Sequence, residues 1–347
     1  MVNTRSLPCS FIFLHLSFII LHSSFCITPI ISAAEVVRLP AVAPLETGSP
    51  GRLVSHPDSS TEILQATAAS GVAAAAEDEP QLPPGARNGV FQKILFDATW
   101  LAHGGWDGFG MTDLQLKSVF ALPCPTIDSP LLITPGFAVH YLDGPNRADL
   151  PPRLHEGYVQ FRWLTQATPT LGIDLAVTPG VYSDFLQEDP ESFRITGHAA
   201  TAWTWTERAK IVLGAAYLDR PDAVSIPIGG LIWTPNDGVK RDLVFPHPKV
   251  SRRIRWERNC PQCTEDWIYL AGEFAGDAWA IRRADGDNDQ VVLSDYRVIL
   301  GVERKSLGGL SSRVEVGYVF SRRIRYTSGT PEYWPTDTVM VRGGLSY

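Results

Sequence analysis

The sequence predicts an all-β protein: an antiparallel transmembrane β-barrel of about 14 strands, with about 12 as the alternative count, preceded by a disordered N-terminal extension. Three observations predict this class. Segments of about ten residues with alternating apolar and polar side chains recur after residue 91. Aromatic residues gather near the ends of these segments, as they do in interfacial girdles. The connections between segments alternate between short turns and longer polar loops, which is typical of membrane barrels.

Residues 1–34 are predicted to form a secretory signal peptide. One positive charge in Met1–Arg5 precedes an apolar run from Phe11 to Leu21, and small residues follow up to Ala34. The run is short for a membrane span, which needs about 20 residues. Cleavage after Ala34 is therefore expected, with an uncleaved anchor helix as the alternative.

Residues 35–90 are predicted to be a disordered, Ala/Pro-rich extension or linker. This stretch has no Phe, Trp or Tyr, and it is rich in Pro, Ala, Ser and acidic residues. Such a composition cannot bury enough apolar surface to offset the entropy of ordering the chain. All ten Trp and ten Tyr residues lie at or beyond Trp100, so residues 91–347 are expected to form the barrel.

The strands follow from the alternation and from the turn signals between them. We expect them at 92–101, 111–122, 131–142, 155–167, 171–182, 195–206, 209–218, 226–235, 240–245, 249–256, 267–275, 294–305, 311–326 and 337–347. Turn chemistry occurs between them at Thr168-Pro169 and at 235–238, for example. Proline cannot donate to a strand ladder, so Pro246 and Pro248 should break 240–256 into two strands. If the pieces around that break, or those near 92–122, do not both span the membrane, 12 strands remain the alternative.

The alternation also assigns faces. In 313–323, Val314, Val316, Tyr318 and Phe320 oppose Arg313 and other polar or small residues. A soluble β-sandwich would show the same period, so the aromatic girdles and the loop lengths decide for a membrane barrel. No run of 18 apolar residues occurs after residue 90, which excludes a helical membrane protein.

The stretches "GGLIWTPNDGVKRDLVFPHPKV", "YLAGEFAGDAWAIRRADG", "DYRVILGVERK" and "EVGYVFSRRIRYTSGTPEYWPTDTVMVRGGLSY" resemble an uncharacterised family of bacterial outer-membrane β-barrel proteins. The resemblance covers about 91–347 and is clearest from Pro227 onward. It implies a location in the bacterial outer membrane, with outer-membrane lipids and the barrel-assembly machinery as partners. The final segment alternates, with Val339, Val341 and Leu345 sharing the parity of Tyr347. In outer-membrane barrels such a final aromatic is the assembly signal, a role we expect for Tyr347. The family brings no assigned reaction or ligand.

Charged residues on the polar parity of the strands are the candidate site. They are Lys117, Arg162, Asp174, Glu273, Arg297, Glu303, Arg313, Glu315 and Arg342. Mixed charges that face a lumen can form a supporting ion-pair network, which we favour slightly, or line a pore and bias its selectivity.

Other motifs predict no catalysis and no cofactor or metal. Cys260 and Cys263 are expected to form a local disulfide in an oxidising compartment, because zinc usually needs a second cysteine pair. This leaves Cys124 over, with its pairing open. His140 and His198 lie on predicted strands, but no Ser/His/Asp spacing accompanies them, so we expect no enzyme. The net charge of −7 argues against nucleic-acid binding.

Three functions are consistent with the sequence. The leading hypothesis is an integral outer-membrane barrel that admits or transports small solutes, like a porin or transporter channel. The second is a non-conducting barrel that serves as a structural or adhesion protein of the envelope. The third is a soluble secreted β-sandwich that binds carbohydrate through exposed Trp residues.

Overall fold

The computed structural model describes residues 89–105, 108–126, 129–145, 148–186, 190–256, 264–306 and 309–347. The predicted signal peptide and almost all of the predicted extension lie outside these residues. The strands are β1 (Phe91–Leu101), β2 (Gly110–Thr126), β3 (Ser129–Asp143), β4 (Arg153–Thr168), β5 (Leu171–Ser183), β6 (Phe193–Thr206), β7 (Ala209–Tyr217), β8 (Ser225–Asn236), β9 (Val239–Phe245), β10 (Lys249–Trp256), β11 (Thr264–Arg282), β12 (Asn288–Ser306), β13 (Ser311–Tyr326) and β14 (Thr338–Ser346). Within the described residues a short 3₁₀ helix, η2 (Pro190–Ser192), is the one helix, and no helix there is long and apolar enough to cross a membrane.

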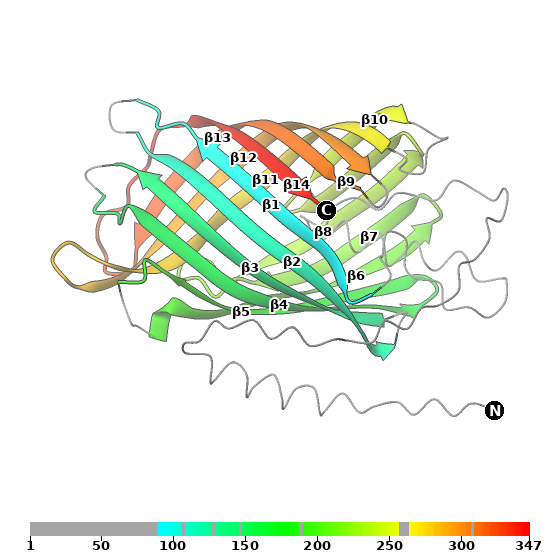
Figure 1. Ribbon diagram of the computed structural model, residues 1–347, viewed down its shortest axis with the longest axis horizontal. Coiled ribbons are helices and arrows are strands. Elements are labelled where there is room, and N and C mark those ends of the chain that lie inside the picture. The colour runs from blue at the N-terminus through cyan, green and yellow to red at the C-terminus, as the bar shows by residue number, and fades with distance from the viewer. Residues whose placement is uncertain are drawn as a thin grey trace, which may run out of the picture. The chain divides into compact units, whose positions relative to one another are not determined.

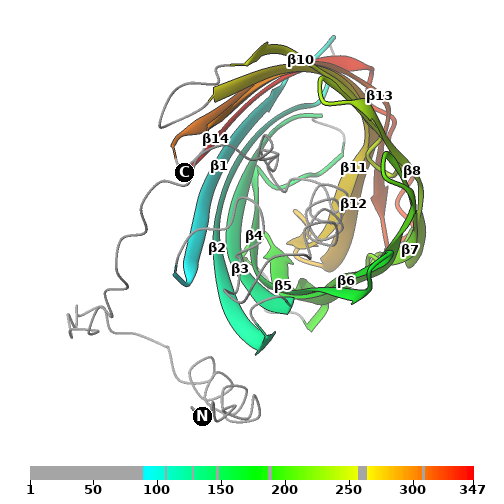
Figure 2. The ribbon, with the colours of Figure 1, turned by 90° about the vertical axis from the view of Figure 1, so that its right-hand side faces the viewer.

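The strands close into a single antiparallel barrel. Each strand pairs with its neighbours in the sequence, and β1 pairs with β14 from Leu95↔Ser346 to Leu101↔Met340. Ile94 and Tyr347 then exchange two backbone hydrogen bonds of 2.9 and 3.0 Å. Figure 1 shows β1 and β14 side by side, and Figure 2 shows the ring of strands from one end. Closure leaves no open sheet edge along this seam, and it rules out the two-sheet sandwich.

All fourteen predicted strands are present, and Pro246, His247 and Pro248 form the turn that separates β9 from β10. The barrel therefore has 14 strands and not 12. Two-residue turns join β4 to β5, β6 to β7 and β8 to β9 at one end of the barrel, the short-turn end. Segments 144–152, 218–224 and 327–337 join strands at the opposite end, the long-loop end. The turn at 246–248 is short although it belongs to the long-loop side.

The hairpin of β11 and β12 differs from the prediction because both strands run farther toward the long-loop end. Residues 278–281 and 289–293 are buried on both faces. Gly276 has a φ of +136°, a conformation that favours glycine, and beyond it Ala280 pairs in parallel with Ser183 of β5. The end of the hairpin thus contacts β5, a strand that is not a neighbour of β11 in the barrel. A strand that is buried on both faces does not alternate, which explains why the sequence pattern missed this part.

A buried apolar cluster surrounds this end of the hairpin. Its members come from β1, β2, β4, β5 and β11–β14 and from the long loops: Leu101, Phe109, Met111, Ala148, Leu154, Tyr182, Trp279, Ile281, Val291, Leu293, Ile299, Val319, Ile324, Tyr326 and Met340. We call it the loop-end cluster. A second, smaller cluster of Ala200, Ala202, Val212, Ile228, Ile232 and Val244 lines β6–β9. The barrel therefore contains an apolar core near the long-loop end in addition to its polar inward face.

Candidate functional site

The inward face of the barrel carries the charged residues that the sequence singled out. Most of the nine predicted lumen residues alternate with exposed apolar neighbours, as Glu315 does between the outward Val314 and Val316. Many are buried: the exposed fraction is 0% for Asp174, 3% for Glu303 and 4% for Glu315. Charges this deeply buried must be paired to be tolerated.

The largest group is a chain of side chains across β11–β14, which we call the central network: Tyr269, Glu273, Asp295, Arg297, Glu315 and Arg342. Glu273 lies directly opposite Arg297 in the strand ladder, and Arg297 donates to it over 3.2 Å. Arg342 donates to the other oxygen of Glu273 over 2.9 Å and, through Nε, to Glu315. Asp295 accepts from Arg297 over 2.6 Å. Each arginine therefore bridges two carboxylates, so negative and positive groups alternate along the chain.

Tyr269 joins this network through a close fit against a glycine. Its hydroxyl donates to Glu315. Tyr269 pairs with Gly301 on β12, and a Cβ atom added at Gly301 would lie 2.3 Å from the ring carbon Cζ of Tyr269. The aromatic ring therefore needs a residue without a side chain opposite it. Packing between the two strands thereby fixes the hydroxyl at the carboxylate.

Two further groups lie on β2–β6. Arg162 donates to Asp174 over 2.7 Å through Nε, and His198 Nε2 lies 3.2 Å from the same carboxylate. Separately, His140 lies between two carboxylates: Nδ1 is 2.7 Å from Asp113 and Nε2 is 3.0 Å from Glu156. Each group connects three adjacent strands. The two groups therefore brace the β2–β6 part of the wall, whereas the central network lies on β11–β14.

The remaining predicted lumen charges lie in smaller contacts. Arg313 donates to Asp97 over 2.7 Å, which ties β13 to β1 across the closing strand β14. Lys117 acts electrostatically on the same carboxylate of Asp97. Glu303 lies 3.5 Å from Lys249 and 3.8 Å from Lys305. All nine predicted residues therefore take part in electrostatic contacts with other inward groups.

Two arginines that the sequence pattern did not single out hold the inward end of β11. Arg194 of β6 is 2% exposed, and it donates to the backbone oxygen of Ala278 over 2.7 Å and to Asp277 over 2.5 Å. Arg220, between β7 and β8, donates to the backbone oxygen of Gly276 over 2.9 Å. These guanidinium groups satisfy the edge of β11 where no neighbouring strand reaches it. Together with the loop-end cluster they hold the end of the β11–β12 hairpin against the strands and loops around it.

Sequence reasoning missed Asp113, Glu156 and Asp295, although they share the inward parity of Lys117, Arg162 and Arg297. Applying the same parity rule to every charge would have found them. No local signal marks Arg194 and Arg220, because their acceptors lie far away in the sequence. Among the described residues, no group of three His, Cys, Asp or Glu side chains could hold a metal ion.

The cysteine prediction needs one correction. Cys124 is disulfide-bonded, so the expectation that it is left over is wrong. Its partner lies outside the described residues, as do Cys260 and Cys263. The predicted pairing of these two therefore stays a prediction.

The outward face is apolar over most strands. Its exposed large residues include Phe96, Leu116, Val177, Leu213, Leu243, Leu270, Val298, Leu300, Val316, Tyr318, Val339, Val341 and Leu345, with exposed fractions from 43% to 63%. Exposed Trp residues lie near both ends: Trp203 and Trp205 on β6 and Trp233 on β8 near the short-turn end, and Trp100 and Trp334 near the long-loop end. A closed barrel with polar side chains inside and an apolar belt outside has the surface of a membrane barrel.

Comparisons with known proteins add little to this description. No family model and no curated protein match the chain. A solved bacterial polysaccharide outer membrane secretin is 10% identical and matches 74% of this chain and 97% of its own, with a TM-score of 0.36. Pseudomonas aeruginosa OpdK, solved with vanillate, has 10% identity, 74% and 97% coverage and a TM-score of 0.28. The transport unit of the autotransporter AIDA-I from Escherichia coli is 7% identical and matches 82% of this chain and 96% of its own, with a TM-score of 0.25.

Similarity at this level carries no argument about the function of this chain. The resemblance to an uncharacterised barrel family stays a prediction, whereas the closed antiparallel barrel that it implied is confirmed. The assignment of this chain to membrane barrels therefore rests on its own two faces.

Proposed function

We propose that the protein is an integral barrel of the bacterial outer membrane that admits small solutes through a gated lumen. The observation that carries the location is the apolar outward belt with Trp residues near its short-turn end. Such a surface is stable in a bilayer and not in water. The observation that supports passage of solutes is the charged inward face, since mixed charges can line a water-filled pore and bias its selectivity.

The gate in this proposal is the long-loop end of β11. The loop-end cluster and the hydrogen bonds from Arg194 and Arg220 close this end, so a solute passes only when the strand is displaced. The same closure favours the second candidate function, a non-conducting structural barrel. The two candidates differ in whether releasing β11 opens a conducting path.

Conductance recording in planar lipid bilayers tests the proposal. The full-length protein is compared with Arg194→Ala and Arg220→Ala, which each remove donors to the β11 backbone. Rare, small openings are expected for the native protein and more frequent openings for both variants. Arg304→Gln, which changes an outward arginine, is the matched control and should behave like the native protein.

Heat-modifiable migration in gels verifies that each variant is a folded barrel before recording. If native protein and both folded variants insert but stay silent, the solute-admitting function is wrong and the structural barrel replaces it. If the protein is recovered from cells in the soluble fraction, the outer-membrane location itself is wrong.

A further inference from the structure

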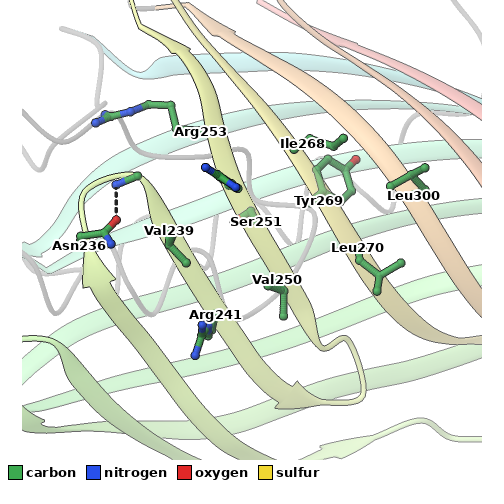
Figure 3. Close-up of a pocket in the computed structure, with 12 residues that line it drawn as sticks. Asn236, Val239, Arg241, Val250, Ser251, Arg253, Ile268, Tyr269, Leu270 and Leu300 are labelled. Carbon is green, nitrogen blue, oxygen red and sulfur yellow. Dashed lines mark hydrogen bonds between the residues drawn. The ribbon is translucent and has the colours of Figure 1, made fainter.

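A shallow groove of about 640 Å³ lies on β9–β12 toward the short-turn end of the barrel. Its apolar floor is formed by the outward side chains of Val250, Ile268, Leu270 and Leu300, which are 37% to 55% exposed. Figure 3 shows Val250 and Leu270 on adjacent strands of this floor, with Arg241 beside Val250. Arg241 and Arg252 line the same groove. The groove therefore combines apolar surface with two guanidinium groups.

The strand register places both arginines on the outward face. Arg241 lies opposite Val250, and Arg252 lies opposite Val239, two positions farther along the same pair of strands. Side chains in such a diagonal relation lie about 7–8 Å apart at their Cα atoms and are within reach of a shared partner. Buried polar residues on the inward face alternate with them, as Asp242 and Ser251 do.

Within the part of the chain that the structure describes, no carboxylate neutralises these two arginines. Among the described residues, neither Arg241 nor Arg252 forms an ion pair. Asp266, an outward carboxylate on β11, accepts two hydrogen bonds of 2.7 and 3.0 Å from Arg304 instead. A pair of unneutralised positive charges at the surface of a membrane barrel is complementary to an anion from the bilayer.

The position along the barrel identifies the kind of anion. Arg241 lies directly opposite Trp233 in the ladder, and its guanidinium carbon is 4.5 Å from the centre of the Trp233 ring. Exposed Trp residues mark the level of lipid headgroups. The guanidinium groups therefore lie at headgroup height. The apolar floor lies beside them on β10–β12, with Val250, Leu270 and Leu300 in the ladder row of Arg241 and Ile268 in the row of Arg252.

In bacterial outer-membrane barrels the short turns lie on the periplasmic side. We propose that Arg241 and Arg252 bind the phosphate of an anionic phospholipid in the periplasmic leaflet, whose acyl chain lies on Val250, Ile268, Leu270 and Leu300. This site rests on the proposed outer-membrane location but not on solute passage. Its ligand is a phosphodiester headgroup that carries an acyl chain, not a free anion. Trp233 orients the Arg241 guanidinium toward it.

The test measures lipid binding by native mass spectrometry of the full-length protein in neutral detergent. Phosphatidylglycerol and phosphatidylcholine are titrated separately. A charge near a membrane surface contributes about 1 kcal/mol per arginine, which is about fivefold in affinity. The native protein should therefore prefer phosphatidylglycerol, and Arg241→Gln and Arg252→Gln should each weaken this preference by about fivefold. The double variant should lose it.

Arg304→Gln is the matched control, because it removes an outward arginine that Asp266 already neutralises, and it should keep the preference. The site is wrong if the native protein shows no preference, if the double variant retains it, or if Arg304→Gln lowers it as much as the double variant. Full competition by inorganic phosphate would replace the lipid with a free anion. Reconstitution into phosphatidylcholine vesicles separates the lipid site from the proposed membrane location. If the protein inserts into these vesicles but shows no preference for phosphatidylglycerol, only the lipid site is wrong. If it does not insert, both the lipid site and the membrane location are wrong.

Discussion

Some residues of the lumen are packed so closely that a small change in side-chain volume would disrupt their contacts. Tyr269 reaches Glu315 only because Gly301 leaves room for its ring. Gly301 faces inward, where polarity is acceptable, but it has no space for a side chain. Steric fit, and not the charge pattern alone, therefore decides which substitutions this wall accepts.

Gly301→Ala should destabilise the barrel by about 1–3 kcal/mol, because the new Cβ overlaps the Tyr269 ring and displaces its hydroxyl from Glu315. The free energy of unfolding is measured by urea titration in detergent micelles. Gly343→Ala is the control, since a Cβ at Gly343 would meet no atom within 4 Å. Equal stability of the two variants would contradict the close fit.

Arg342 is the residue on which the central network depends most, since it bridges Glu273 and Glu315. Arg342→Gln leaves these carboxylates with fewer partners in a buried setting, and a loss of about 3 kcal/mol is expected. Arg304→Gln removes a pair whose arginine side chain is 55% exposed and should cost about 0–1 kcal/mol. Urea unfolding monitored by Trp fluorescence compares the free energies of unfolding of the two variants. If Arg342→Gln lost less stability than Arg304→Gln, the central network would not stabilise the barrel.

At the scale of elements, β11 and β12 change character along their length. Their parts near the short-turn end alternate and form barrel wall, whereas residues 278–281 and 289–293, beyond Gly276 and Ser294, are enclosed on both faces. The change occurs where the short turn at 246–248 leaves β11 without a neighbouring strand. Because the polar backbone of β11 still needs partners there, Arg194 and Arg220 supply them.

The segment 327–337 after β13 is bound to that strand by ion pairs. Glu332 accepts hydrogen bonds from Arg323 over 2.8 Å and from Arg325 over 2.7 Å. The hydrogen bonds from Arg323 lower the pKa of Glu332 below its ordinary value. A lowered carboxyl pKa means that the contact stabilises the segment at pH values above the ordinary pKa and is lost as the pH falls through the lowered value.

Hydrogen exchange of 327–337 should therefore accelerate only at acidic pH, below the ordinary range of a glutamate pKa. Glu332→Gln should exchange faster at neutral pH and show no such acid transition. A native protein whose exchange, corrected for intrinsic rates, is the same at neutral and acidic pH would contradict the role of this contact.

At the scale of the whole molecule, two opposite faces decide where the protein is stable. Val298 is 47% exposed on the outward face, while its neighbour Ile299 is 1% exposed inside. Val298→Arg should destabilise the inserted barrel by about 2–4 kcal/mol if the residue lies near the middle of the bilayer. Val298→Leu is the control, and unfolding in vesicles is the measurement. Equal stability of the two variants would show that this face does not contact lipid.

The sequence by itself predicted an antiparallel barrel of about 14 strands, with 12 as the alternative, and the two faces of the alternating segments. These properties follow from an alternation of period two and from proline and glycine turns, which are local features. The nine inward charges were found for the same reason. The assembly role of Tyr347 and the N-terminal segments remain predictions from the sequence.

Only the tertiary structure decided which charges meet and where the barrel closes. Asp97 and Arg313 are far apart in the chain and meet only because β1 pairs with β14. The inward end of β11 depends on Arg194, Arg220 and Ser183, which no nearby pattern connects to it. A strand enclosed on both faces loses its alternation, so contacts across the barrel, and not neighbours in the chain, determine its path.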